Sequence, residues 1–387
     1  MDESPLSYRS AAAMLDSMSP DPIPSLAPDE FAPETAYLNT ASMGLPPART
    51  RAVLTADIAE WAAGRANPVA YDVPVGASRA AFARLVGAPA GQVAIGSQVS
   101  SLVGLIAAAL PDRAEVLLGQ GDFTSLTQPF HGRGDLTVRT VPLEELAASV
   151  GPATALVAVS AVQSADGRVA DIAALRAATS AYGARLLVDG TQAVGWLPIR
   201  ADQVDYLVCG AYKWLLAPRG TAFLVVSPEA AATLRPVAAG WYAGEDPWAE
   251  CYDTVRLATS ARRFDVAPAW HAFAGTAPSL ALIEELTPAR IGAHNLALAE
   301  RFRAGLAGLG HRPVPGESAI VSTPGLGTAA AELARAGVVM SNRAGNLRAA
   351  FHLYTTSADV DRALDVLAGL PSLAAKEPEG ADRKSVV

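Results

Sequence analysis

Short apolar runs, each bounded by Gly or polar residues, recur along the chain, and longer stretches with helical spacing separate them. The clearest runs are Arg185–Asp189 and 205–209, and both are typical of strands buried on two faces of a parallel sheet. Alternation of such strands with helices predicts strand-helix-strand units joined by right-handed crossovers. We therefore expect an α/β protein with a mostly parallel sheet and helices on both faces. Its other expected strands are Glu115–Gly119, 136–141, Thr154–Ser160 and 221–226.

Helical spacing of apolar residues predicts the elements between and after these strands. The expected helices are 46–63, 76–86, 100–110, 171–182, 228–234, 278–285 and 291–309. Beyond residue 310 we expect strands 318–323, 338–341 and 347–354, and helices 328–336 and from 358 onward. The chain should divide into an N-terminal arm (1–35), a large domain (36–286), a smaller C-terminal α/β domain (287–370) and a polar, disordered tail (371–387).

Composition narrows the class of protein. With 387 residues, 51% of them hydrophobic, and a mean hydropathy of +0.23, the chain can bury a large core. A net charge of −8 without a long basic run argues against nucleic acid as a partner. The two cysteines, Cys209 and Cys251, form neither a disulfide framework nor a metal-binding spacing, so we expect no metal. No apolar leader and no run of ~18 apolar residues is present, so we expect a cytoplasmic protein without a membrane partner.

Two ionisable residues follow the two clearest strands. Asp189 closes the first strand, and Lys213 lies shortly after the second, between Tyr212 and Trp214. Ligands of open α/β sheets bind at the carboxyl ends of the strands, so both side chains should face one crevice. A lysine among aromatic rings loses part of its preference for the charged form, and its amine can then form a Schiff base with a carbonyl cofactor. An aspartate beside it can keep a pyridine nitrogen protonated, and the pair therefore suggests pyridoxal 5′-phosphate.

The stretch around these residues resembles a known family. D-G-T-Q-A-V-G at 189–195 is followed by a strand and by G-A-Y-K-W at 210–214, with Gly220 beyond it. This pattern resembles the class V aminotransferases, which with cysteine desulfurases, kynureninase and isopenicillin N epimerase share the fold type I architecture of pyridoxal-phosphate enzymes. The resemblance runs from about residue 37 to about residue 370. It implies a homodimer in which two chains build each site.

The resemblance assigns cofactor contacts to residues of this chain. Lys213 would carry the cofactor and move the α-proton, Asp189 would hold the pyridine nitrogen, Gln192 would lie near the ring and Phe123 would stack on it. The phosphate would lie at the start of the helix near 100, where unpaired N–H groups and the helix dipole favour an anion. Its expected contacts are Ser97, Gln98, Val99 and Tyr212. A polar residue near the 3-hydroxyl would be Gln163 or Ser164.

Substrate contacts follow from two other segments. Y-L-N-T-A-S-M-G at 37–44 corresponds to the mouth of the family's site, so Asn39, Thr40 and Ser42 are candidates. The family also carries an arginine before a Tyr-Asn-Thr segment and an Asp-containing helix start. Arg348, followed by Tyr354, Thr355, Thr356 and Asp359, matches most of this pattern. Arg348 would bind the α-carboxylate through two N–H groups of its guanidinium, and Arg343 is a second candidate for that role.

The chain departs from the family pattern at two points. Many members carry Phe-Glu-x-Gly-Thr as a phosphate contact from the partner chain, whereas this sequence has F-D-V-A-P at 264–268. The alternatives for that contact are Trp270, His271, Gly275 and Thr276. Cysteine desulfurases use a nucleophilic cysteine in the loop before the arginine strand, and S-N-R-A-G-N-L-R at 341–348 has none, which argues against persulfide formation.

These residues leave the outcome of the reaction open. A lysine base, a carboxylate-binding arginine and no thiol fit a C–S lyase acting on an S-substituted cysteine, similar to hercynylcysteine sulfoxide lyase. Trp241, Tyr242 and Trp248 would then hold a bulky S-substituent. An aminotransferase, a decarboxylating deaminase and an epimerase of the same family are the alternatives, and an inactive binding protein with this fold is a further one. No G-x-G-x-x-G or P-loop follows a strand, which argues against a nucleotide enzyme.

Overall fold

The computed structural model describes residues 22–370. The first 21 residues of the predicted arm and the tail predicted to be disordered lie outside the described residues. Residues 22–35 run along the C-terminal part of the chain, where the Leu26 N–H donates to the carbonyl of Leu353 (2.8 Å).

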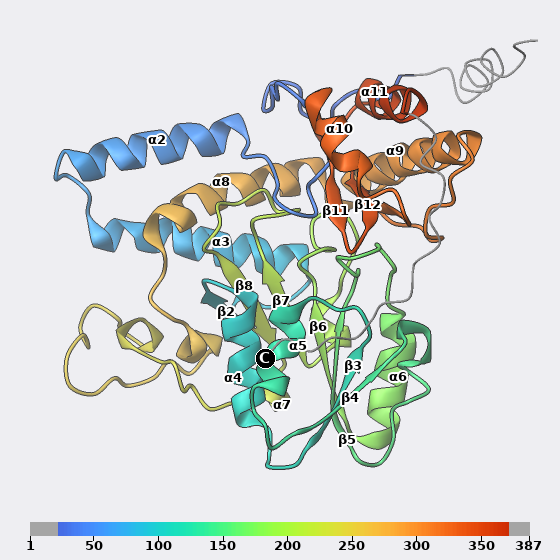
Figure 1. Cartoon of the computed structure of the whole chain (residues 1–387). Coiled ribbons are helices and arrows are strands. Elements are labelled where there is room, and N and C mark those ends of the chain that lie inside the picture. The colour runs from blue at the N-terminus through green and yellow to red at the C-terminus, as the bar shows by residue number, and fades with distance from the viewer. Residues whose placement is uncertain (1–21, 371–387) are drawn as a thin grey trace, which may run out of the picture.

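A seven-stranded sheet forms the centre of the molecule (Figure 1). Its order is β2-β8-β7-β6-β5-β3-β4, and the pairs among β3 to β7 are parallel, whereas β8 is antiparallel to both neighbours. The fold-class prediction is therefore confirmed. The strands are β2 (Val93–Gly96), β3 (Glu115–Gly119), β4 (Thr137–Val141), β5 (Thr154–Ser160), β6 (Arg185–Asp189), β7 (Tyr206–Gly210) and β8 (Ala222–Val226).

Strand β2 is the one strand of this sheet that the sequence analysis did not predict. Its four residues lead almost directly into α4 (Val99–Ala109), so the apolar residues of strand and helix read as one stretch. All four residues of β2 are buried beside β8. Its position brings the start of α4 to the edge of the central strands.

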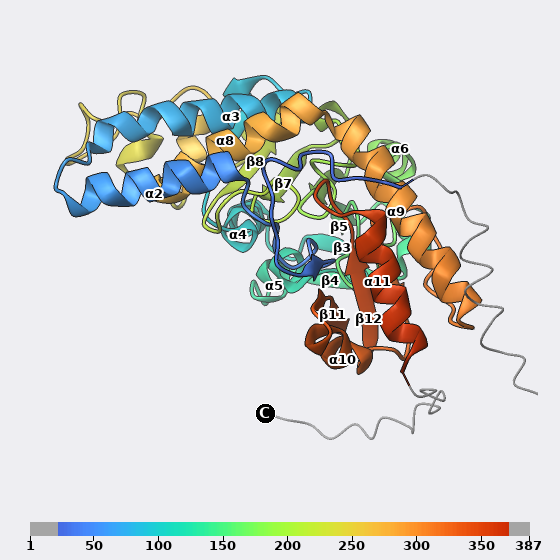
Figure 2. The same cartoon turned by 90° about the horizontal axis from the view of Figure 1, so that it is seen from above.

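Helices cover both faces of the sheet. On one face α3 (Asp72–Leu85), α8 (Trp270–Leu286) and α6 (Ile172–Tyr182) share one apolar core. Helix α2 (Ala48–Ala62) lies against α8 and buries only Thr50 (Figures 1 and 2). On the other face α4, α5 (Thr124–His131) and α7 (Pro228–Ala231) pack against the alternate strand residues. The two apolar cores therefore hold the strand ends rigidly between them.

Helix α8 is longer than predicted, because it begins at Trp270 and not at Pro278. Proline favours the first turn of a helix, which placed the predicted start at Pro278, yet Pro278 lies inside α8. The turns before Pro278 are packed closely against the rest of the chain, since a side chain at Gly275 would meet Pro218 and Leu54. Helix α3 likewise begins at Asp72, before the predicted residue 76.

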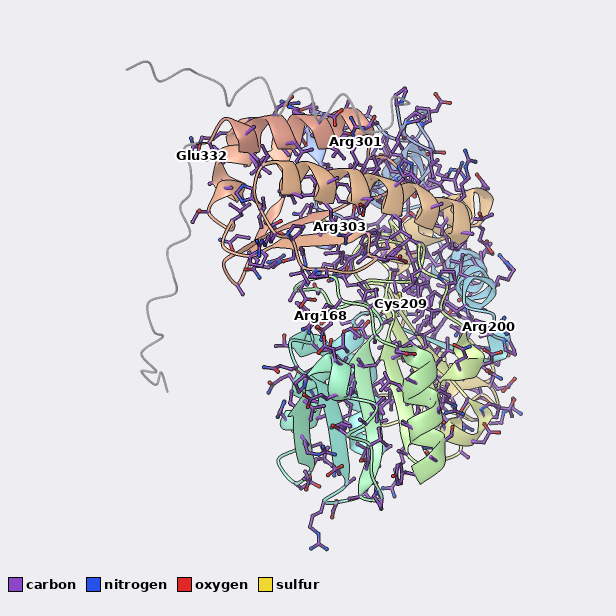
Figure 3. All side chains as sticks on the ribbon, turned by 90° about the vertical axis from the view of Figure 1, so that its right-hand side faces the viewer. Arg168, Arg200, Cys209, Arg301, Arg303 and Glu332 are labelled. Atoms are coloured by element: carbon purple, nitrogen blue, oxygen red, sulfur yellow. The ribbon has the colours of Figure 1, made fainter. Side chains whose placement is uncertain are left out.

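The C-terminal part has a core of its own. A three-stranded antiparallel sheet with the order β11-β12-β9 packs against α9 and α11, above the central sheet in Figure 3. Strand β1 (Ala36–Tyr37) pairs with β10, so the first strand of the predicted large domain joins this part. The other elements are α9 (Pro288–Gly308), β9 (Ile320–Thr323), α10 (Ala329–Arg335), β10 (Val338–Val339), β11 (Ser341–Arg343), β12 (Asn346–Ala350) and α11 (Ser357–Ala368).

Two predicted strands of this part differ from the structure. The run 338–341 is split between β10 and the start of β11, which belong to different sheets. The run 347–354 ends as a strand at Ala350, because the chain turns through 352–355, where the Thr355 N–H donates to the carbonyl of His352 (2.8 Å). Helix α11 then begins with a capping box between Thr356 and Asp359. The boundary at 286/287 stays a prediction.

No helix within residues 22–370 is long and apolar enough to cross a membrane. Over the same residues, no group of three or more His, Cys, Asp or Glu side chains is arranged to hold a metal ion.

Candidate active site

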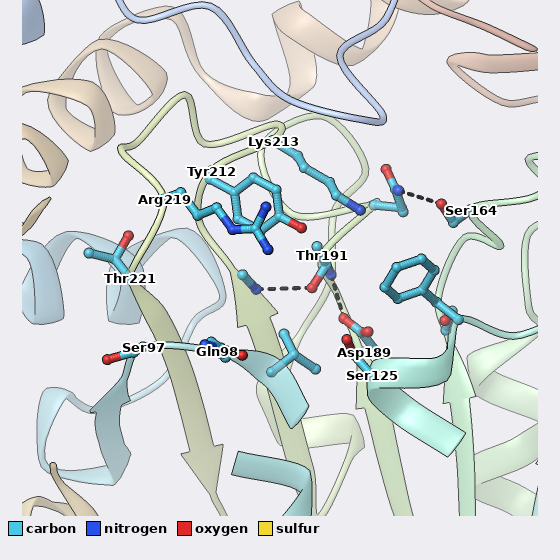
Figure 4. Close-up of a pocket in the computed structure, with 15 residues that line it drawn as sticks. Ser97, Gln98, Ser125, Ser164, Asp189, Thr191, Tyr212, Lys213, Arg219 and Thr221 are labelled. Carbon is cyan, nitrogen blue, oxygen red and sulfur yellow. Dashed lines mark hydrogen bonds between the residues drawn. The ribbon is translucent and has the colours of Figure 1, made fainter. Parts of the chain in front are cut away.

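A pocket that is partly open to solvent lies at the carboxyl ends of β5, β6 and β7 (Figure 4). Ser160, Asp189 and Gly210 are the last residues of these three strands, and all three line it. The parallel strands therefore bring together residues that are far apart in the sequence. The full lining is Ser97, Gln98, Val99, Phe123, Ser125, Ser160, Ser164, Asp189, Thr191, Gln192, Gly210, Tyr212, Lys213, Arg219 and Thr221.

Asp189 is buried on the floor of this pocket. Its Oδ1 accepts a hydrogen bond from the backbone N–H of Thr191 (2.8 Å). Burial raises the pKa of its carboxyl group, while the Thr191 hydrogen bonds and the charge of Lys213 oppose that rise. The Thr191 hydroxyl accepts from the Gly210 N–H (2.9 Å) and so ties the loop after β6 to the end of β7. A buried carboxylate of this kind is suited to a cationic N–H of a ligand.

Lys213 is buried above Asp189. Burial lowers the pKa of its ammonium group to about 8; the charge of Asp189 opposes this shift, whereas the charges of Arg348 and Arg343 add to it. Its Nζ lies 5.3 Å from the ring centroid of Phe123 and 5.6 Å from that of Tyr212. A substantial fraction of the amine form is therefore available near neutral pH, as a nucleophile or a base.

The loop that carries Lys213 is braced by the predicted mouth segment. The Gly44 N–H donates to the carbonyl of Tyr212 (3.0 Å), and a Cβ at Gly44 would overlap the carbonyl oxygen of Lys213. Gly44 is thus required by a close approach of two backbones. Through this contact the N-terminal segment fixes where Lys213 stands.

Gln192 is buried and lines the pocket, where its side chain connects three segments. Its Nε2 donates to the carbonyl of Ala41 (3.0 Å) and to the Ser164 hydroxyl (2.9 Å), and its Oε1 accepts from the Trp214 indole (2.7 Å). It therefore joins the lysine loop, the mouth segment and the loop after β5.

The start of α4 forms one end of the pocket. Ser97 and Gln98 precede this helix, and Val99 is its first residue, one residue before the predicted start. Tyr212 stands beside them, and burial raises the pKa of its hydroxyl while the charge of Arg219 opposes that rise. The guanidinium carbon of Arg219 lies 5.4 Å from the Tyr212 ring centroid (Figure 4). The sequence analysis missed Arg219, because a single arginine in a loop carries no pattern of its own.

Arg348 is buried beside the other end of the pocket, behind Ser164. One of its terminal nitrogens donates to the Ser164 carbonyl and hydroxyl, and the other donates to the Ser42 hydroxyl (2.8 Å). Its Nε is buried without a hydrogen-bond partner, and no carboxylate within residues 22–370 forms an ion pair with it. Burial, together with the charge of Arg343, lowers the pKa of Arg348 to about 9. A buried guanidinium without a counter-charge is suited to a ligand carboxylate.

The other predicted substrate contacts gather around Arg348. The Ser42 hydroxyl donates to Asn39 Oδ1 (2.8 Å) and also accepts from an Arg343 terminal nitrogen (2.9 Å). Arg343 is exposed at the end of β11. Thr40 is buried, and its hydroxyl is hydrogen-bonded to the Tyr354 hydroxyl (2.5 Å).

Gln163 and Ser164, the two alternatives for one cofactor contact, are separated by the structure. Gln163 is buried and donates to the Gln120 carbonyl (2.8 Å) and to Asp122 (3.2 Å), whereas Ser164 lines the pocket. Asp122 itself was missed by the sequence analysis. Burial raises the pKa of its carboxyl group to about 7, and the nearby charge of Asp189 adds to the effect. Its Oδ2 accepts from the Ser160 N–H (3.1 Å) and so holds the loop next to Phe123.

Two groups of predicted residues lie outside this pocket. Gly275 and Thr276 are buried in α8 of their own chain, which removes them as contacts for a partner chain. Trp270 stacks on Tyr71 (5.5 Å between centroids), and His271 Nδ1 lies 2.6 Å from Asp57. Asp265 of the F-D-V-A-P segment is buried in an ion pair with Arg79 (2.6 Å), so its role in this fold is structural.

The aromatic loop does not line the pocket of its own chain. The Tyr242 hydroxyl (2.8 Å) and the Trp248 indole (2.6 Å) both donate to Asp72 at the start of α3, and Trp241 packs on both rings. The lining of the pocket of the same chain does not include these residues, and their part in holding an S-substituent stays a prediction. The sequence pattern did not indicate Asp72 as the hydrogen-bond partner of both rings.

A lysine with a lowered pKa above a buried aspartate, at the carboxyl ends of parallel strands, defines a carbonyl-cofactor site of the fold type I kind. The chain matches the model of the aminotransferase class-V family over residues 132–363, and it belongs to that family. It is 30% identical over 310 residues to the "Uncharacterized aminotransferase YcbU" of Bacillus subtilis (75% of this chain, 82% of that relative). It is 29% identical over 384 residues to isopenicillin N epimerase of Streptomyces clavuligerus (87% and 95%).

Solved structures share the fold. The cystine C–S lyase C-DES in complex with its product cysteine persulfide superimposes with a TM-score of 0.79 at 22% identity, covering 87% of this chain and 98% of that one. A C-DES mutant with glycine covalently linked to the PLP cofactor gives a TM-score of 0.80 at 21% identity, covering 87% and 97%.

Members of this family depend on pyridoxal 5′-phosphate, and the cofactor prediction is confirmed. The residues present fit this cofactor. A buried lysine and aspartate lie side by side, Phe123 is 47% exposed at the opening, and the start of α4 with Arg219 provides donors for a phosphate.

Proposed function

We propose that this protein is a C–S β-lyase that uses pyridoxal 5′-phosphate to cleave an S-substituted cysteine in a small-molecule pathway. The observation that carries the proposal is a lysine amine in a pocket whose lining has no thiol, with a buried arginine that lacks a counter-charge, Arg348, directly behind the lining residue Ser164. Cys209 is buried in β7 (Figure 3), and burial raises its pKa well above the usual value. Cys251 is exposed and is not among the residues that line the pocket. Sulfur would therefore leave the substrate without attack by a protein cysteine.

The cofactor would be held by residues from five segments. Lys213 would bind its aldehyde carbon, Asp189 would pair with the pyridine nitrogen, Phe123 would stack on the ring, and Ser164 would lie near the 3-hydroxyl. The phosphate would lie at the start of α4, with Ser97, Gln98, Val99, Tyr212 and Arg219 around it. When bound, the cofactor supplies an electron sink for the bonds at the substrate's α-carbon.

The chain's own residues would then carry out the elimination. Arg348 holds the α-carboxylate, and Lys213 takes the proton from the α-carbon. The electron pair of that C–H bond forms a double bond between Cα and Cβ, and the Cβ–S bond breaks with its electron pair on sulfur. Sulfur leaves as a thiolate that takes up a proton, and water hydrolyses the three-carbon remainder to pyruvate and ammonia.

The relatives support this reaction and one alternative. C-DES, which shares the fold, is described as a cystine C–S lyase. The epimerase of Streptomyces clavuligerus is 29% identical to this chain and also covers 87% of it, which supports inversion at the α-carbon as the second candidate. Both reactions start with removal of the α-proton by Lys213, so the products formed, pyruvate or the inverted amino acid, distinguish them.

A panel of cysteine S-conjugates tests the lyase. The purified holoenzyme should release pyruvate, ammonia and one thiol per substrate in equal amounts, without any keto acid. Pyruvate would be followed with lactate dehydrogenase, and thiol with a chromogenic disulfide. A requirement for a keto acid would indicate an aminotransferase, and inversion without pyruvate would indicate an epimerase; either result rejects the lyase while leaving the cofactor in place.

Arg219 provides a prediction about the phosphate. Replacing Arg219 with alanine should weaken binding of pyridoxal 5′-phosphate to the apoprotein by about 10-fold or more, because a charge-assisted contact is lost. Binding of pyridoxal, which has no phosphate, should stay unchanged. Both affinities can be measured from quenching of tryptophan fluorescence. Arg200→Ala, an exposed arginine paired with Asp202, is the matched control. Equal losses for both ligands would mean that Arg219 does not contact the phosphate.

A further inference from the structure

Two arginines converge on one hydroxyl group at the substrate end of the site. A terminal nitrogen of Arg348 lies 2.8 Å from the Ser42 Oγ, and a terminal nitrogen of Arg343 lies 2.9 Å from the same oxygen. The Ser42 hydroxyl directs its only proton to Asn39 Oδ1 (2.8 Å), so it can only accept from both arginines. Asn39 thus orients the Ser42 hydroxyl, whose oxygen accepts from both arginines.

The two charges are not compensated by the protein. Neither arginine forms an ion pair with a carboxylate within residues 22–370, whereas nearby Arg168 pairs with both Asp166 and Glu144. The charges of Arg343 and Arg348 also lower the pKa of Lys213, which shows that the three positive groups are close enough to interact electrostatically. Asp189 is the one carboxylate that opposes this field at Lys213, and it lies at the cofactor end of the pocket.

The two arginines differ in ways that suit two different ligand groups. Arg348 is buried and donates to Ser164 on one side and to Ser42 on the other. The remaining N–H groups of its guanidinium suit one planar group, such as the α-carboxylate. Arg343 is exposed and is held by one hydrogen bond, so its remaining donors are open to a group that extends from the substrate toward solvent. One α-carboxylate would leave the charge of Arg343 unmatched.

We propose that the substrate carries a second anionic group on its side chain and that Arg343 binds it while Arg348 binds the α-carboxylate. This inference rests on the proposed function in that the substrate is an amino acid, and it adds that the S-substituent ends in a carboxylate or a similar anion. Arg343 is then a specificity-determining residue. A neutral S-substituent would leave the charge of Arg343 unmatched.

Isosteric ligand pairs test the charge alone. The holoenzyme would be titrated with S-carboxymethyl-L-cysteine and its amide, S-carbamoylmethyl-L-cysteine, and with L-aspartate and L-asparagine. Binding is measured from the first change in the visible absorbance of the cofactor, before turnover. The acid of at least one pair should bind roughly 10- to 100-fold more tightly than the amide, as expected for a charge-assisted contact. The pair with the larger ratio reports the distance at which the second anion lies.

Variants then assign the effect to Arg343. Arg343→Gln should bring the acid-to-amide ratio close to one, with little change for the amides, and Arg343→Lys should keep part of the ratio. Arg348→Lys should weaken acids and amides alike. Arg335→Gln on α10, an exposed arginine outside the site, is the matched control and should change nothing.

The outcomes separate this inference from the proposed reaction. An acid-to-amide ratio near one in the wild type, or a ratio that survives Arg343→Gln, would overturn the second-anion inference even if pyruvate is formed. Equal weakening of acids and amides by Arg343→Gln would place Arg343 on the α-carboxylate and overturn it as well. A clear preference for acids without pyruvate would support the inference and reject the lyase. An absence of any spectral response to amino acids would reject both.

Discussion

Replacing Lys213 with alanine is expected to abolish covalent attachment of the cofactor and to lower turnover by about 10²- to 10⁴-fold from loss of the proton-transferring base alone. Lys213 is buried beside Asp189, and burial lowers its pKa to about 8, so its amine is the nucleophile in the pocket. The chain has three lysines, Lys213, Lys376 and Lys384. Lys213 is the one lysine within residues 22–370.

The other two lysines provide the control for this experiment. Lys376→Arg together with Lys384→Arg should retain full activity and the visible absorbance band of the wild type. Added primary amines should restore part of the proton transfer in Lys213→Ala, which a merely misfolded variant would not show. Wild-type turnover by Lys213→Ala would contradict the assignment.

Replacing Arg348 with lysine is expected to weaken binding of amino acids by about 10- to 100-fold. The reason is that the lysine ammonium cannot contact both carboxylate oxygens in parallel as the guanidinium can. Affinity for the cofactor should remain within about 2-fold of wild type, since no cofactor contact is lost. Absorbance titration with a non-reacting amino acid measures the first quantity, and fluorescence titration of the apoprotein measures the second.

A buried arginine also has a structural role, and the controls address it. Arg348 donates to Ser164 and Ser42, so the thermal stability of Arg348→Lys should be compared with that of Ser164→Ala, which removes one of these contacts. If amino-acid affinity is unchanged while stability falls, Arg348 is structural and Arg343 becomes the candidate for the α-carboxylate.

The sequence predicted the strand ends better than the helix starts, for a physical reason. Strands β3, β5 and β6 have the predicted bounds, because each is a buried apolar run that stops at a polar or Gly residue. Their order along the chain placed Asp189 and Lys213 at one edge of the sheet before any contact was known. Helix α8 was predicted to start late because Pro278 has a local preference for a first turn, and the close packing at Gly275 overrides it.

The residues that the sequence missed stand in loops without a repeating pattern. Asp122 is brought to Ser160, far along the chain, by the fold, whereas the contact between Arg219 and Tyr212 is decided by the course of the loop that carries both. The hydrogen bonds of Tyr242 and Trp248 to Asp72 could not be predicted either, because Asp72 is distant in the sequence. A signal was nonetheless present in the composition. Residues 22–370 contain many arginines but only one lysine, Lys213, and this composition marks Lys213 as unusual.

The central claim is that Lys213 carries the cofactor, and borohydride reduction followed by peptide mapping tests it most directly. Reduction of the holoenzyme should fix one pyridoxyl group per chain, and trypsin should then leave residues 201–219 as one peptide, uncleaved at the modified Lys213. Mass spectrometry would locate the added group on that residue. A pyridoxyl group on Lys376 or Lys384, or none on the chain, would contradict the account.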